Sequence, residues 1–212
     1  MAAAPPMTHA IRILVVDDHP VYRAGIVALI DSTPDMTVVA EAEDALMGIA
    51  AFERTRPDVT LVDLVMPGTD GVGVIKAIRL IDPAARVVVL TTYGGDTQAR
   101  RALAAGAQAY LLKTTAGNDL AAAIRGVHAG RHHISASVAR DLADHPATKV
   151  LSEREVSILR GAAAGLENKQ IAERLGLSPE TIKEHLSHAM SKLHANNRTH
   201  AVAIAIERGF LR

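Results

Sequence analysis

The chain has 212 residues, of which 49% are hydrophobic, and its 23 basic and 23 acidic side chains give a formal net charge of zero. It has no cysteine, which excludes disulfides, thiolate metal sites and cysteine catalysis, and its 2% of aromatic residues argue against a platform that stacks unpaired bases. Without a signal-like segment or an apolar run of the roughly 18 residues that span a membrane, we expect a soluble, cytoplasmic protein of two domains that does not bind membranes.

Up to about residue 128, short apolar runs typical of buried strands alternate with amphipathic segments typical of helices. We expect strands at residues 11–16, 36–41, 59–64, 86–91 and 109–112. We expect helices from the first strand to about residue 30, at 44–54, at 71–80, from the fourth strand to residue 105, and at 117–128. Five successive strand–helix units predict an α/β fold with an open, doubly wound, five-stranded parallel sheet.

Five polar side chains come at the points where these strands end. They are Asp17, Asp18, Asp63, Thr91 and Lys113. The carboxyl ends of parallel strands meet at one edge of a sheet, so we expect the five to converge there. Each one alone has an ordinary explanation, since an aspartate can cap a helix, a threonine favours strands and a lysine is usually solvated. Together they indicate a site.

The chemistry of this group points to phosphoryl transfer. Three carboxylates that lie close together repel one another unless a cation joins them. Oxygen ligands without histidine or cysteine favour Mg²⁺, which commonly binds phosphoryl oxygens as well. Asp63 would then be the nucleophile that forms an acyl phosphate, Lys113 would neutralise the transferring oxygens, and Thr91 would donate a hydrogen bond to the attached group.

These residues resemble the receiver domain of two-component response regulators. The resemblance rests on Asp17-Asp18, Asp63-x-x-Met66-Pro67-Gly68, Thr91 and Tyr110-Leu-Leu-Lys113. It implies the strand order 2-1-3-4-5 and a sensor histidine kinase that phosphorylates Asp63. It also implies that Mg²⁺ is bound directly by Asp18, Asp63 and the Val65 carbonyl, and through water by Asp17.

The same resemblance assigns Thr91 and Tyr110 to a switch pair. On phosphorylation, the hydroxyl would move toward the phosphoryl group and the aromatic ring would turn inward into the vacated space. On the sequence pattern alone, the ordinary interpretation of Tyr110 is a half-buried aromatic residue of a strand.

The domain boundaries follow from changes in pattern and charge. We expect a disordered tail at residues 1–9, a receiver domain at 10–128, a linker at 129–148, where periodicity fades, and a second domain at 149–212. Residues 1–148 carry 13 basic and 16 acidic side chains, whereas residues 149–212 carry 10 and 7. The net charge of +3 on the second domain only hints at an anionic partner.

The second domain has the start and stop signals of four helices. The first begins with the capping box Ser152-Glu-Arg-Glu155. A short second helix is expected at residues 168–175, after which Gly176 turns the chain, and Ser178-Pro179 supplies an N-cap and a first-turn proline for the third. A short helix, a glycine turn and a longer capped helix are typical of a helix-turn-helix. On pattern alone the last apolar segment, 199–210, closes the four-helix core.

This domain resembles the LuxR-type helix-turn-helix. The motifs are Leu151-Ser-Glu-Arg-Glu155, Gly165-Leu-Glu-Asn-Lys-Gln-Ile-Ala172, Ser178-Pro-Glu-Thr-Ile-Lys183 and Lys192-Leu193. The resemblance implies that Lys183, Glu184 and Ser187 face base edges in the major groove. It implies phosphate contacts by Asn168, Lys169, Thr181 and Arg198. It also implies dimerisation through the segment 199–210, as an alternative or an addition to closing the core. On pattern alone this polar face could be an ordinary solvated surface.

Together the two halves resemble the NarL/FixJ family of response regulators. The resemblance implies a phosphorylation-dependent transcriptional regulator, not an enzyme, that binds promoter DNA and forms a homodimer when active. Two alternatives remain. One is a DNA-binding or interaction module that works without phosphorylation. The other is an aspartyl-phosphate phosphatase, which would have a second acid two residues after its nucleophile, where this chain has Val65.

Overall fold

The computed structural model describes residues 10–66, 69–92, 96–114, 116–144 and 151–211. The chain divides into two compact units, one comprising the stretch up to Thr92 with Arg101–Ala136, and the other comprising Tyr93–Arg100 with Ser137–Arg212. The tail expected at residues 1–9 lies outside the described part, and the expected domain boundaries stay a prediction. No helix in the described ranges combines the length and apolarity needed to cross a membrane.

The amino-terminal elements alternate strands and helices, as the sequence predicts. In chain order they are β1 (Ile11–Val16), α1 (Pro20–Asp31), β2 (Met36–Ala42), α2 (Ala45–Thr55), β3 (Val59–Asp63), β4 (Val65–Met66), β5 (Thr69–Asp70), α3 (Gly71–Ile81), β6 (Val87–Thr91), α4 (Asp96–Ala104), β7 (Ala109–Leu112), α5 (Ala116–His128), β8 (His133–Ile134) and α6 (Ala136–Asp144).

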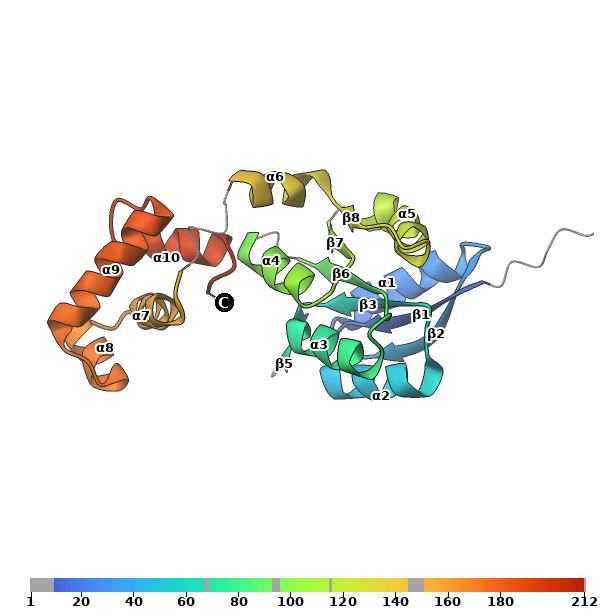
Figure 1. Cartoon of the computed structure of the whole chain (residues 1–212), viewed down its shortest axis with the longest axis horizontal. Helices are drawn as coiled ribbons and strands as arrows, with labels where there is room; N and C mark the ends of the chain where they lie inside the picture. Colours follow the sequence, from blue (N-terminus) through green and yellow to red (C-terminus); the bar gives the residue numbers. More distant parts are fainter. Residues whose placement is uncertain (1–9, 67–68, 93–95, 115, 145–150, 212) are drawn as a thin grey trace, which may run out of the picture. The chain divides into compact units, whose positions relative to one another are not determined.

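The main sheet has the order β2-β1-β3-β6-β7-β8, and all its strand pairs are parallel. The central strand β3 is buried at every residue because helices cover both faces. Figure 1 shows α1 and α5 on one face and α2 and α3 on the other. Ile26 of α1 and Ile124 of α5 share a core cluster with Leu61 of β3. The predicted doubly wound architecture and the predicted order of its first five strands are confirmed.

The predicted linker contains secondary structure that the sequence did not indicate. The span 129–148 contains the short strand β8 and the helix α6. The His133 amide donates to the Gln108 carbonyl at 2.9 Å, which adds β8 beside β7. Within the described ranges the sheet therefore has six strands, not the predicted five. The sequence did not indicate β8, because a strand of two residues is too short to show a periodicity. Two further short strands, β4 and β5, form an antiparallel pair directly after β3.

Over the described residues 151–211, the carboxyl-terminal domain forms four helices, as predicted. They are α7 (Glu153–Ala163), α8 (Asn168–Leu175), α9 (Pro179–Leu193) and α10 (Arg198–Glu207). The capping box forms, since the Ser152 hydroxyl accepts from the Glu155 amide at 3.2 Å and the Glu155 carboxylate accepts from the Ser152 amide at 2.7 Å. Gly176 ends α8 with a positive φ of 64°, which favours glycine, and Ser178 caps α9. Ile158, Ile182 and Ala201 belong to one core cluster that joins these helices.

Candidate functional site

The strand order brings the polar strand ends to one edge of the sheet. β1, β3, β6 and β7 are successive neighbours, so the residues that end or follow them face the same crevice. The Lys113 amide donates to the Thr91 carbonyl at 2.7 Å, which fixes the backbone where β7 ends beside β6. The Asp17 amide donates to the Ala42 carbonyl at 3.0 Å and fixes the end of β1 in the same way. The positions of these side chains are therefore set by backbone pairing.

Lys113 joins two of the carboxylates. Its Nζ atom lies 2.7 Å from Asp17 Oδ2 and 2.7 Å from Asp63 Oδ2. The three side chains are almost fully buried, with exposed fractions of 5% for Lys113, 4% for Asp17 and 1% for Asp63. An ammonium held between two carboxylates offsets the repulsion that would otherwise separate these acids. The sheet edge therefore holds a buried cluster of opposite charges.

Asp63 is the most enclosed of the acids. Its Oδ1 atom accepts a hydrogen bond from the Val65 amide at 3.0 Å, while its other oxygen contacts Lys113. Burial raises the pKa of the Asp63 carboxyl, although the hydrogen bonds from Lys113 and from the Val65 amide oppose this. Both carboxylate oxygens are thus oriented by the protein before any ligand arrives.

The start of α3 packs closely against the segment that follows Asp63. The Asp70 side chain caps α3 by accepting from the Val72 amide at 3.2 Å. A Cβ atom at Gly71 would lie 2.3 Å from the Asp63 carbonyl oxygen and 2.6 Å from Leu64 Cα, distances that only glycine avoids. Gly71 therefore permits the close approach that holds the Asp63 backbone in place.

The acidic residues at this edge have the geometry of a cation site. One ligand atom each from Asp17, Asp18, His19 and Asp63 can be chosen so that all lie within 4.8 Å of one another. His19 Nδ1 lies 2.7 Å from Asp18 Oδ1, but the two lack hydrogen-bond geometry. This buried oxygen has no hydrogen-bond partner among the residues that the structure describes. Carboxylate oxygens suit Mg²⁺, and a buried one that accepts no hydrogen bond fits a cation there.

The predicted switch residues lie on neighbouring strands beside this cluster. Thr91 ends β6 and Tyr110 lies in β7, and both side chains are buried. The interpretation of Tyr110 as a half-buried residue is therefore wrong, since the exposed fraction of its side chain is zero. Burial and then the charge of Asp63 raise the pKa of Tyr110.

Two further residues of the site were missed by the sequence reasoning. His19 directs its imidazole at the acids, with Nδ1 3.6 Å from Asp17 and 3.8 Å from Asp63. Tyr22, in the first turn of α1, lies with its ring centroid 4.5 Å from Lys113 Nζ. Their place in the sequence could have indicated them, because residues between an acidic strand end and the first turn of the following helix border the same crevice.

In the carboxyl-terminal domain, α9 presents the residues expected at base edges. Lys183, Glu184 and Ser187 are exposed on α9, whereas Ile182 and Leu186 of the same helix are buried in the core. The amphipathic pattern of α9 is thus realised, with one face packed and the other open. This is the arrangement in which a helix can enter a groove of DNA.

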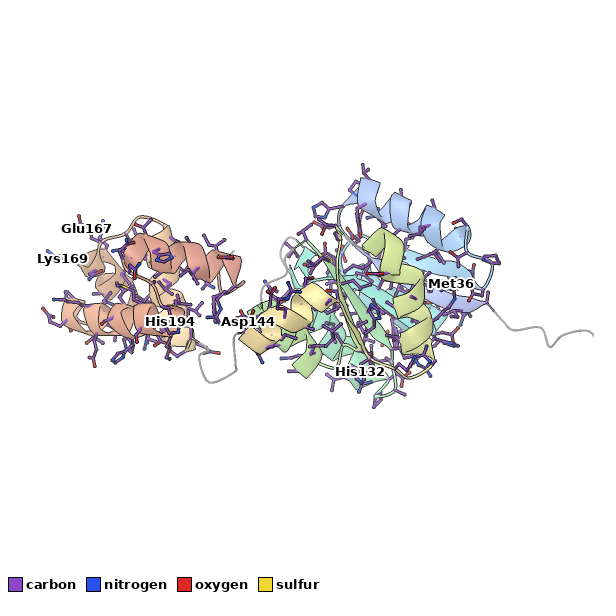
Figure 2. All side chains as sticks on the ribbon, turned by 90° about the horizontal axis from the view of Figure 1, so that it is seen from above. Met36, His132, Asp144, Glu167, Lys169 and His194 are labelled. Atoms are coloured by element: carbon purple, nitrogen blue, oxygen red, sulfur yellow. The ribbon has the colours of Figure 1, made fainter. Side chains whose placement is uncertain are left out.

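The residues expected at phosphates surround the beginnings of three helices. Thr181 lies in the first turn of α9, where its hydroxyl is 3.0 Å from Ser178 Oγ. Lys169 is exposed in the first turn of α8 and, as Figure 2 shows, lies at the same end of the domain as Glu167. Arg198, at the start of α10, donates to the Leu166 carbonyl and to Asn168 Oδ1. Arg198 and Asn168 are therefore partly engaged within the protein.

A partly buried ion pair fixes α9 against α7. Lys192 Nζ lies 2.8 Å from Glu155 Oε2, the carboxylate that also caps α7. The hydrogen bonds from Lys192 and Ser152 outweigh burial and lower the pKa of Glu155. A single carboxylate therefore sets both the start of α7 and the position of the exposed helix.

The fold and site define a domain that receives a phosphoryl group, joined to a helix-turn-helix domain. Residues 13–125 match the family model described as response regulator receiver domain. Residues 149–205 match the model described as bacterial regulatory proteins, luxR family. The chain therefore belongs to the NarL/FixJ-type response regulators of two-component systems, which are transcriptional regulators with a LuxR-type DNA-binding domain.

Relatives match along nearly the whole chain. The transcriptional regulatory protein LiaR of Bacillus subtilis is 36% identical, with 92% of this chain and 96% of the relative covered. The nitrate/nitrite response regulator protein homolog of Haemophilus influenzae is 34% identical, with 95% and 99% covered. The structure of RcsB from Salmonella enterica serovar Typhimurium, bound to a promoter in the presence of the phosphomimetic BeF3-, is 30% identical, with a TM-score of 0.73 and 92% and 98% covered.

Proposed function

We propose that this regulator is controlled by phosphorylation of Asp63. The observation that carries the proposal is the contact of 2.7 Å between the buried Asp63 carboxylate and Lys113 Nζ, with a second carboxylate, Asp17, on the same ammonium. Burying charges in a protein is costly, so a cluster of this kind is better explained by chemistry than by packing. A cation beside the reacting oxygen also neutralises the charge that develops during phosphoryl transfer.

In the proposed step, Asp63 attacks the phosphorus of a phosphohistidine on a sensor histidine kinase. A new O–P bond forms the acyl phosphate, the P–N bond to the imidazole breaks, and the released imidazole takes up a proton. The Lys113 ammonium then faces the oxygens of the transferring group. The Thr91 hydroxyl donates a hydrogen bond to that group once it is attached.

The residues that would hold Mg²⁺ are Asp17, Asp18, Asp63 and the carbonyl of Val65. The Asp18 oxygen that accepts no hydrogen bond and the Asp63 carboxylate supply the hard oxygen ligands that this ion prefers. When bound, Mg²⁺ neutralises charge on the phosphoryl oxygens. The carboxylates themselves keep the ion and the nucleophile on the same edge of the sheet.

The proposed output is binding of a homodimer to promoter DNA in the cytoplasm. Movement of Thr91 and Tyr110 would couple the acyl phosphate to the surface of the receiver domain. Lys183, Glu184 and Ser187 would read base edges. Asn168, Lys169, Thr181 and Arg198 would contact phosphates. RcsB, solved on a promoter with a phosphomimetic, supports this coupling of input to output.

Labelling by acetyl phosphate tests the input directly. The full chain should take up one phosphoryl group in the presence of Mg²⁺, and Asp63→Asn should take up none. Asp70→Asn is a matched control, since Asp70 caps a helix nearby without belonging to the cluster. Equal labelling of wild type and Asp63→Asn would reject the phosphoacceptor. Unchanged DNA selection with and without the donor would favour a module that works independently of phosphorylation.

A further inference from the structure

We propose that Tyr22 is a positioning residue whose ring holds Lys113 in the acidic cluster during phosphoryl transfer. This inference rests on the proposed function. The centroid of the Tyr22 ring lies 4.5 Å from Lys113 Nζ, within the range of a cation–π interaction. Asp17, Asp63 and the ring thus contact one ammonium. The aromatic face supplies the one contact of the three that carries no formal charge.

The place of Tyr22 is fixed by the junction between β1 and α1. The His19 amide donates to Asp17 Oδ1 at 2.9 Å, and Pro20 starts the helix. Arg23 Nη1 donates to the Asp17 carbonyl at 2.5 Å, which ties the first turn of α1 to the end of the strand. The Tyr22 ring itself packs against the core cluster beneath α1. Lys113 is therefore covered by a group with little freedom to move.

The ring, and not the hydroxyl, carries the contact. The Tyr22 oxygen is buried and has no hydrogen-bond partner within the described ranges. Burial, and then the charges of Asp17 and Asp63, raise the pKa of Tyr22 to about 12, so the phenol stays neutral at ordinary pH. Phenylalanine would retain the aromatic face and remove only an unpaired oxygen. The two parts of the side chain can therefore be separated by mutation.

The ring becomes important when Lys113 changes partners. During transfer, the ammonium must leave the Asp63 oxygen for an oxygen of the incoming phosphoryl group, while keeping its contact with Asp17. A lysine side chain has many rotamers and a strongly hydrated ammonium, so it tends to move into water when one partner is lost. The Tyr22 face does not react and stays in place throughout the exchange. It therefore keeps the cation near the transferring oxygens.

The test compares Tyr22→Phe and Tyr22→Leu with wild type in the full chain. The rate of labelling by acetyl phosphate is measured with saturating Mg²⁺ over a range of donor concentrations. Tyr22→Leu should lower the maximal rate about two- to thirty-fold, the range expected for loss of a cation–π contact, with a smaller change in the half-saturating donor concentration. Tyr22→Phe should label at the wild-type rate.

Leu29→Ala controls for a loss of packing, because Leu29 lies on the same helix and packs against the same core cluster. It should lower the melting temperature and leave the labelling rate unchanged. Labelling of Tyr22→Leu at the wild-type rate, or an equal loss in Tyr22→Phe and Tyr22→Leu, would overturn the role of the ring. Failure of the wild type itself to take up label would instead reject the proposed function.

Discussion

Lys113 Nζ and Asp63 Oδ2 lie 2.7 Å apart at the carboxyl edge of the sheet, although 50 residues separate them in the chain. The pair is buried, and the same ammonium also contacts Asp17. Two buried acids can lie this close only because a cation compensates them. The stability of this edge and its chemistry therefore depend on the same lysine.

Lys113→Met should destabilise the receiver domain by about 3 kcal/mol in the absence of divalent ions, because two buried carboxylates lose their cation. Millimolar Mg²⁺ should restore much of this stability by binding the folded state. Urea denaturation followed by circular dichroism, with and without Mg²⁺, measures both effects. Lys76→Met, at an exposed position of α3, should change little. Similar losses in the two variants would contradict the account.

Gly71→Ala should destabilise the protein by about 1–3 kcal/mol, because the added methyl group would overlap the Asp63 backbone. The displaced backbone should also slow phosphoryl uptake. Gly73→Ala is the matched control in the same helix, since nothing lies within 4 Å of its added Cβ. It should be neutral or stabilise the helix by about 0.5–1 kcal/mol. Equal labelling rates in the two variants would argue against a role for this close approach.

Glu155 should give the carboxyl-terminal domain an acid-sensitive component of stability. Its pKa is lowered from 4.5, so its contribution is present above that value and is lost as the pH falls through the lower pKa of the folded state. Glu155→Gln should reduce this pH dependence and cost about 1–2 kcal/mol at neutral pH. Hydrogen exchange of α7 and α9 peptides, corrected for intrinsic rates, measures the change.

Glu153→Gln provides the comparison for that experiment. Glu153 lies in the same first turn of α7 but is exposed. It should therefore change protection by less than about 0.5 kcal/mol. If both variants alter protection and its pH dependence equally, the ion pair of Glu155 with Lys192 is not the source of the effect.

Lys183→Ala should weaken binding to a selected DNA site by about 1–3 kcal/mol and relax specificity at one base pair. Lys169→Ala should instead weaken binding to all sequences alike and reduce the salt dependence by about one counterion. Affinity measurements on a panel of single-base variants at several salt concentrations separate the two. An equal loss of affinity for all sequences in Lys183→Ala would show that Lys183 contacts phosphates and not base edges.

Much of the fold was predictable because its long elements carry strong periodicity. The central strands are apolar runs that end in polar residues, so the positions of Asp63 and Lys113 at a shared edge followed from the sequence. The strands β4, β5 and β8 could not be predicted, because a strand of two residues is too short to show alternating polarity. Their pairing depends on neighbours that only the folded chain supplies.

The sequence predicts where the residues of the site lie along the fold better than it predicts the contacts between their side chains. The resemblance implies a phosphate contact for Arg198, but its bond to the Leu166 carbonyl depends on how the start of α10 packs against the segment before α8. The Tyr22 ring reaches Lys113 through a contact between α1 and the end of β7. Such contacts join residues distant in sequence and have no local pattern. Residue types and strand ends therefore predict which side chains lie at the same edge of the sheet, but not which of their atoms are in contact.

Phosphorylation of Asp63 should raise the affinity of the chain for DNA. The most direct measurement is the Kd of the full chain for a duplex selected from a random library, taken with and without acetyl phosphate and Mg²⁺. We predict about 5- to 150-fold tighter binding on phosphorylation, as expected for an allosteric coupling of ~1–3 kcal/mol, and no change in Asp63→Asn. An unchanged Kd in fully phosphorylated wild type, or an equal gain in Asp63→Asn, would contradict the account.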